Sequence, residues 1–211
     1  MKHFLLFFVA IVLSTGGIQG CGDTGINSNS SDNVRLTGSG NLETREMDFS
    51  GFSKIEVGSV FKATVVKSED YSVTLHLDDN VFPYLRAIQK EGRLILDLHD
   101  VDSTQNLTLK AEIAMPDLEA AVISGVSSAE ISGFELDHAV EFDVSGVSHL
   151  SGNISAGDVK CTLSGVSKIS LSGSGGDLDA DVSGTSNFEL SNFTSHNADI
   201  NIDGVSNGIV N

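Results

Sequence analysis

Serine recurs at one position of a repeated phrase, and one copy has the spacing of a catalytic nucleophile. Gly204-Val205-Ser206-Asn207-Gly208 matches the G-x-S-x-G pattern, in which a tight strand-to-helix turn presents serine to a substrate carbonyl. That chemistry also needs a following helix and a histidine downstream, and neither follows here. We therefore expect no catalytic residue, and interpret the recurring serines as a hydroxyl ladder that bonds backbone groups at a turn. Its members are Ser127, Ser148, Ser167, Ser186 and Ser206.

Four carboxylates near the C-terminal end could hold a cation. Asp177, Asp179 and Asp181 alternate along one segment, and Asp199 follows one repeat later. Carboxylate oxygens are the ligands that Ca²⁺ prefers, so these residues are candidates for a calcium or ligand site. The other interpretation is charge that keeps the surface soluble, with Lys160 between Glu141 and Asp179 in a column of alternating sign.

The remaining chemistry-bearing residues favour no enzyme. Five histidines lack the spacing of metal-ligand pairs, and we expect them on the solvated surface: His76, His99, His138, His149 and His196. A polysaccharide lyase would set a basic residue beside acidic calcium ligands, but no arginine follows Arg93. We expect no cofactor, with calcium as the one alternative.

Strands must position these residues, because apolar and polar residues alternate almost everywhere beyond Val34. We find no stretch of ten or more residues with helical periodicity, and the only helical turn is expected at 78–85, capped by Asp or Asn with Pro83 near its start. The clearest strands are 53–57, 60–66, 71–77, 93–98 and 107–113. The sequence therefore predicts an all-β protein.

From about Asp117 the alternation becomes a repeat with spacings of 21, 19, 19 and 20 residues. Its anchors are Ser124-Gly125, Ser145-Gly146, Ser164-Gly165, Ser183-Gly184 and, in the fifth copy, Asp203-Gly204. Apolar columns flank each anchor and are expected to face inward, among them the column after the glycine: Val126, Val147, Val166, Thr185 and Val205.

A strand, a Ser-Gly corner and a second strand describe one coil of a β-solenoid. About 20 residues per coil predicts a single-stranded, right-handed parallel β-helix over 117–211. Residues 34–116 are expected to form less regular β structure, either irregular coils or a capping sheet.

The N-terminus predicts export. Residues 1–20 have the basic start and short apolar run of a signal peptide, and Ile18-Gln19-Gly20-Cys21 is similar to the lipobox of bacterial lipoproteins. We therefore expect lipidation at Cys21 and a flexible tether over 21–33. With Cys21 lipidated, Cys161 would be a small buried residue with no bridge.

The order of these elements resembles a known family. The segment Asp48 to Val57, a turn at 78–85, the strand 93–98 and the SGVS copies are similar to the exported bacterial auto-transporter adhesin head domain, or head GIN domain. The resemblance covers about 48–211 and implies a β-helical, surface-exposed lipoprotein whose family name suggests adhesion. It implies no catalytic residues.

The net charge of −17 argues against nucleic acid as a partner. We expect an exported envelope lipoprotein at the outer membrane or cell surface, held by its lipid and displaying an adhesin-like head to a glycan or protein. Two alternatives remain open: a carbohydrate-active or calcium-dependent glycan-binding protein using Asp143, Asp179, Asp181 and Asp199, and a structural envelope spacer.

Overall fold

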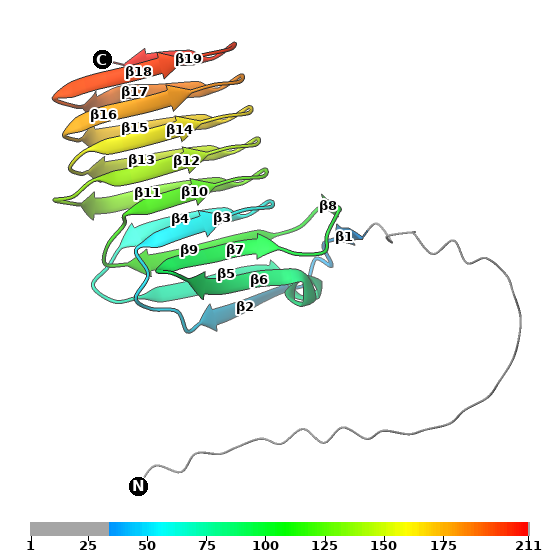
Figure 1. Cartoon of the computed structure of the whole chain (residues 1–211). Helices are drawn as coiled ribbons and strands as arrows, with labels where there is room; N and C mark the ends of the chain where they lie inside the picture. The colour runs from blue at the N-terminus through cyan, green and yellow to red at the C-terminus, as the bar shows by residue number, and fades with distance from the viewer. Residues whose placement is uncertain (1–33, 211) are drawn as a thin grey trace, which may run out of the picture. The chain divides into compact units, whose positions relative to one another are not determined.

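The computed structural model describes residues 34–210. They form nineteen strands and one short 3-10 helix, and most strand pairs are parallel, so the predicted all-β class is confirmed (Figure 1). Among these residues no helix is both long and apolar enough to cross a membrane. The signal peptide, lipidated cysteine and tether predicted for 1–33 lie outside the described residues.

Two large sheets contain nearly all of the strands. Sheet 1 has the strand order β18-β16-β14-β12-β10-β3-β7-β6, and sheet 2 the order β19-β17-β15-β13-β11-β4-β9-β5-β2. From β10 onward the chain alternates between the sheets, so that one strand of each, with the corner joining them, makes a layer. The strands of these layers are β10 (Ala120–Ile123), β11 (Ser128–Glu135), β12 (Val140–Val144), β13 (His149–Ser155), β14 (Val159–Leu163), β15 (Lys168–Ser174), β16 (Asp177–Val182), β17 (Asn187–Thr194), β18 (Asn197–Ile202) and β19 (Asn207–Val210).

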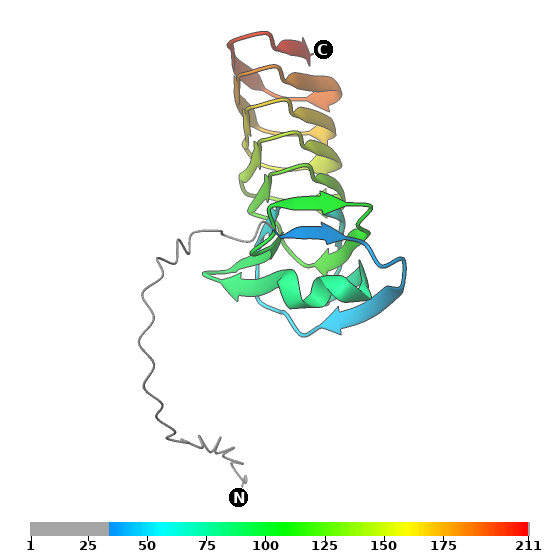
Figure 2. The ribbon, with the colours of Figure 1, turned by 90° about the vertical axis from the view of Figure 1, so that its right-hand side faces the viewer.

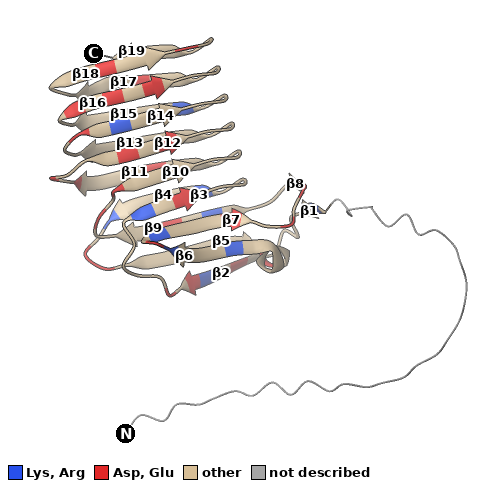
Figure 3. Cartoon of the chain, in the orientation of Figure 1, with Lys and Arg blue, Asp and Glu red and all other residues tan. Residues whose placement is uncertain are grey.

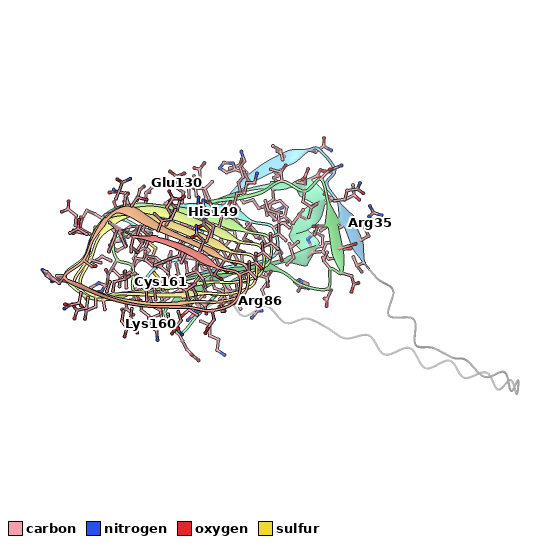
Figure 4. The ribbon with its side chains drawn as sticks, turned by 90° about the horizontal axis from the view of Figure 1, so that it is seen from above. Arg35, Arg86, Glu130, His149, Lys160 and Cys161 are labelled. Atoms are coloured by element: carbon pink, nitrogen blue, oxygen red, sulfur yellow. The ribbon has the colours of Figure 1, made fainter. Side chains whose placement is uncertain are left out.

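Parallel pairing stacks equivalent residues of the repeat on one another. In sheet 1, Phe142 pairs in register with Ala121 on one side and with Cys161 on the other, and all three are fully buried. Alternate residues face inward because successive side chains of a strand point to opposite faces. Figure 4 shows the result down the stack, with Cys161 between the sheets and its neighbour Lys160 outside sheet 1. The inner faces of both sheets therefore share one apolar core.

The corner between the two strands of a layer needs glycine. Gly165 has φ = 75°, and a Cβ there would lie 2.5 Å from the carbonyl oxygen of Gly146 in the layer before. The corners approach so closely because Val166 N–H donates to that same carbonyl at 2.7 Å. The glycine thus supplies both the left-handed backbone and the space for layers to stack.

The residues after the glycine do not lie as expected. Val126, Val147, Val166 and Val205 are between 57% and 80% exposed, so their predicted inward orientation is wrong. The serine that follows takes the inward place: Ser127, Ser148, Ser167 and Ser186 are each 3% exposed. Their hydroxyls donate to carbonyls that the corner leaves available, such as Ser127 Oγ to Gly58 at 2.8 Å and Ser167 Oγ to Ser164 at 2.7 Å. A buried hydroxyl with such a partner avoids the cost of burial without a hydrogen bond.

The N-terminal part of the fold mixes parallel and antiparallel pairing. The strands β3 and β4 form a first layer, parallel to β10 and β11, while β2, β5 and β6 pair antiparallel with their neighbours. Figure 2 shows these antiparallel strands and the helix at one end of the stack. The elements are β1 (Arg35–Thr37), β2 (Leu42–Met47), β3 (Lys54–Val57), β4 (Lys62–Lys67), β5 (Ser72–Asp78), η1 (Asp79–Tyr84), β6 (Leu85–Lys90), β7 (Arg93–Leu98), β8 (Ser103–Gln105) and β9 (Leu109–Met115).

The predicted helical turn at 78–85 is a 3-10 helix, but its details differ. Asp78 occupies the N-cap position, but its side chain makes no capping hydrogen bond. This buried carboxylate instead accepts hydrogen bonds from the backbone N–H groups of Gly40 and Thr108, at 2.8 and 2.7 Å. Pro83 lies near the end of η1 rather than near its start. Asp78 therefore ties the strand ends around η1 together.

Candidate binding groove

A groove of about 1050 Å³ runs along sheet 1. It crosses the beginnings of β10, β12, β14, β16 and β18, where the chain enters sheet 1 from sheet 2. We call it the sheet 1 groove. Because neighbouring strands lie ~4.8 Å apart, its length along the stack is about 20 Å.

The floor and walls of the sheet 1 groove come from adjacent positions of the repeat. Val140, Val159 and Leu178 lie in register along the floor, but they are almost fully buried and their side chains belong to the apolar core. The next residue in each strand points outward, which places Glu141, Lys160, Asp179 and Asp199 in a second column. Equivalent positions of successive repeats therefore lie in straight columns along the outer face of sheet 1.

One half of the groove carries charges that are paired. Lys54 Nζ lies 3.3 Å from Glu119, and Lys160 Nζ lies 3.8 Å from Glu141. The expected column of alternating charge is therefore only partly realised, since Lys160 makes an ion pair with Glu141 but none with Asp179. Exposed pairs of this kind contribute little to stability, so their main effect is to neutralise this half of the groove.

The other half is acidic, and the one lysine beside it in the lining, Lys160, lies in register with Asp179 but is paired with Glu141. Asp158, Asp177, Asp179 and Asp199 line it, which brings together three of the four predicted ligand residues. Asp158 Oδ1 accepts the Asp177 backbone N–H at 2.9 Å, and Asp177 Oδ1 accepts Asn197 Nδ2 at 2.8 Å. Figure 3 shows acidic residues on β16 and β18, toward this end of the stack.

Asp181, the fourth predicted residue, lies outside the groove. It is two residues further along β16 than Asp179 and accepts Asn201 Nδ2 at 3.4 Å. Across residues 34–210, no three His, Cys, Asp or Glu side chains come together as metal ligands would.

His138 lies at the opposite end of the groove and was expected only on the solvated surface. Its ring nitrogens lie 2.9 Å from the Ala139 carbonyl and 2.8 Å from Asp117 Oδ1. The hydrogen bond to Ala139 and then the one to Asp117 favour the charged ring, so they raise the pKa of His138 above its usual 6.5. His138 follows Asp117 by 21 residues, one repeat length, so the repeat spacing contained the signal for this pair.

The other candidates stay apart from the groove. His149 is half-buried on sheet 2, where burial and then the charge of Lys168 lower its pKa. Cys161 is fully buried, and burial followed by the charge of Asp179 raises the pKa of its thiol to about 12. Ser206 Oγ accepts the backbone N–H of Ser186 at 3.2 Å, as a member of the corner ladder.

A smaller hollow of about 340 Å³ lies on the outer face of sheet 2. It contains hydroxyl and amide side chains, and Asn153 Nδ2 donates to Ser172 Oγ at 2.8 Å. Because these side chains partly hydrogen-bond to one another, this face leaves fewer hydrogen-bonding groups free for a ligand than the acidic half of the sheet 1 groove does.

Comparisons with known proteins agree with this fold. The family model described as "Putative auto-transporter adhesin, head GIN domain" matches residues 51–211, and no curated protein matches significantly. A structure described as a putative adhesin from Parabacteroides merdae has a TM-score of 0.60 at 16% identity, covering 82% of each chain. One described as a putative lipid binding protein from Parabacteroides distasonis has a TM-score of 0.59 at 18% identity, covering 80% of this chain and 81% of the other.

At such low sequence identity, the two structural matches show a shared fold alone. The family model, in contrast, matches most of the sequence and shows family membership. The resemblance expected from the order of strands and SGVS copies is thereby confirmed. This chain belongs to the auto-transporter adhesin head GIN domain family.

Proposed function

We propose that this chain is an adhesin-like binding head that holds an extended ligand in the sheet 1 groove at the bacterial surface. The observation that carries the proposal is the continuity of the groove, which crosses five strands and has outward charges repeated at strand spacing. A linear ligand matches such a surface because it can make one contact per layer. Family membership supports an exported or surface protein that binds rather than catalyses.

The ligand proposed is a protein segment rich in lysine or arginine. Four carboxylates line the acidic half, and the one lysine of the lining that lies beside them, Lys160, is already paired with Glu141, so their net field favours positive charge. The groove lining contains no aromatic residue on which a sugar ring could stack, so this class fits better than a neutral glycan.

Octalysine, fluorescently labelled, is a suitable probe of this groove. We expect binding that weakens with salt and is reduced severalfold by Asp179→Lys. Asp181→Lys is the matched control, because it makes the same charge change on the same strand outside the groove. Equal loss in both variants would contradict the proposed site.

The alternative ligand is a glycan bound with calcium at Asp143, Asp179, Asp181 and Asp199. A glycan array with and without Ca²⁺ tests it, since calcium-dependent binding would favour it over the basic segment. If Asp179→Lys leaves both binding and attachment to surfaces unchanged, the third interpretation, an envelope spacer, becomes the better one.

The fold proposed is a right-handed, single-stranded parallel β-helix of about 20 residues per coil, with residues 34–116 capping it. Register-preserving parallel pairing and alternation of the chain between two sheets support it. For the anchor we propose lipidation at Cys21 after removal of 1–20, with a tether to residue 33. Labelling with a palmitate analogue tests this, and an unlabelled chain that Cys21→Ala does not release would contradict it.

A further inference from the structure

The exposed apolar residues gather at the two ends of the stack. Apart from the corner valines, six large apolar side chains are exposed, and five of them lie on the four outermost strands of the sheets. At one end these are Ile202 on β18 with Ile209 and Val210 on β19; at the other they are Ile88 on β6 and Leu42 on β2. Edge strands also carry backbone groups that no neighbouring strand satisfies, so both ends can accept another strand.

The charges at the two ends of sheet 1 are opposite. One column runs in register from the β6 end to the β18 end of sheet 1. It begins with Lys90, Arg93 and Lys54, continues through Ala120, Glu141 and Lys160, and ends with Asp179 and Asp199. Arg93 and Lys54 are already paired with Glu56 and Glu119, at 3.2 and 3.3 Å. Lys90, on the edge strand itself, has only a weak partner in Glu91 at 3.9 Å, and no ion pair involves Asp199 within residues 34–210. Two β18 edges facing each other would bring like charges together, whereas β18 facing β6 brings opposite charges together.

The register of sheet 1 fixes how the two ends would meet. The strand β6 runs antiparallel to β7, and β7 runs parallel to the rest of the sheet, so β6 of a second copy would pair antiparallel with β18. If the outward columns stay aligned, Asp199 lies opposite Lys90 of the second copy. Counting along the antiparallel strands then places Asp203 opposite Arg86 and Asn201 opposite Ile88. Two charge pairs therefore flank the newly covered apolar side chain.

We propose that this chain self-associates head to tail, with β18 of one copy extending sheet 1 of the next at β6. Such a contact joins unlike surfaces and leaves a free edge at each end, so it generates an open filament rather than a closed dimer. An adhesin-like head assembled in this way would present its groove repeatedly along one line. The contact uses the edges of the sheet, but Asp199 also lines the groove, so the contact is tested without ligand.

Paired cysteines test the contact in the full-length protein in cells. Residues opposite each other in an antiparallel pair have Cα atoms about 4.5–5.5 Å apart, within the range that a disulfide bridges. Asp199→Cys combined with Lys90→Cys should give a ladder of multimers on a non-reducing gel, because the two positions lie at opposite ends of one copy. Lys160→Cys combined with Lys90→Cys is the matched control and should give no ladder.

A charge swap tests the electrostatic argument by sedimentation without ligand. Asp199→Lys should weaken concentration-dependent association about tenfold at low salt, and adding Lys90→Asp should restore it. Circular dichroism checks that each variant folds. Absence of association by the unmodified protein, or dimers of Asp199→Cys alone with no ladder from the pair, would overturn the proposal.

Discussion

Replacing Gly165 by alanine tests whether the glycine of the repeat is required for the corner between two strands to form and stack. At φ = 75° alanine adopts the left-handed region, which costs about 1–2 kcal/mol. Its Cβ would also lie 2.5 Å from the Gly146 carbonyl oxygen, which accepts the Val166 N–H in the native corner. Relieving that clash weakens a backbone hydrogen bond worth about 0.5–1.5 kcal/mol. We therefore expect Gly165→Ala to lower the free energy of unfolding by about 2–4 kcal/mol.

Gly40→Ala separates the two contributions. Gly40 has a similar φ of 80°, but no atom lies within 4 Å of the position of its Cβ, so only the cost of the left-handed conformation applies. Urea unfolding followed by circular dichroism measures both variants, since the chain has no tryptophan. If both variants lose the same stability, the close approach of corners does not require glycine, and the explanation of the repeat given above is refuted.

Three further predictions concern the core and the groove. Phe142→Ala should cost about 3–5 kcal/mol of unfolding free energy, whereas Val166→Ala, at an exposed corner, should change it by less than about 0.5 kcal/mol; similar urea midpoints would contradict the burial of the two columns. Iodoacetamide at pH 8 should leave Cys161 unmodified in the folded protein and label it in urea, because burial raises the pKa of its thiol to about 12. The mass of the proteolytic peptide that contains Cys161 reports the labelling. Labelling of the folded protein would argue against this burial. Because the pKa of His138 is raised in the folded state, its hydrogen bonds contribute stability that is fully present below pH ~6.5 and is lost as the pH rises through the folded-state pKa. His138→Gln should therefore destabilise the protein more at pH 5.5 than at pH 8.5. NMR titration of the ring checks the direction of the shift, and a pKa at or below 6.5 would contradict it.

The sequence predicted the strands of the repeat and most of its inward columns because both depend on local alternation. Leu163 and Ile169 face inward as the two-residue period requires. Ser167 lies an even number of residues from both and faces inward as well. The prediction of an inward Val166 is wrong because apolar character alone favours burial, whereas the two-residue period, which the chain maintains through the corner, places this side chain outside. Strict parity would have placed Ser167 inside and Val166 outside.

The groove was harder to predict because it depends on contacts between layers. The spacing of Asp177, Asp179 and Asp199 predicts an acidic cluster, but their place along one groove follows from the register of sheet 1. Asp117 and His138 are separated by one repeat length, yet no motif distinguishes them from solvated surface residues. The antiparallel strands of 34–116 lack the repeat altogether, so their order could not be derived from it.

The central claim is that the ligand binds in the sheet 1 groove, where the outward residues differ from one copy of the repeat to the next. A comparison of the affinity of octalysine for Asp179→Lys and for Asp181→Lys tests this claim most directly. Both variants add the same charge to β16, and only Asp179 lines the groove. We predict that Asp179→Lys loses severalfold more affinity than Asp181→Lys at low salt. Equal affinities in the two variants would show that only net charge attracts the peptide, and would contradict the account.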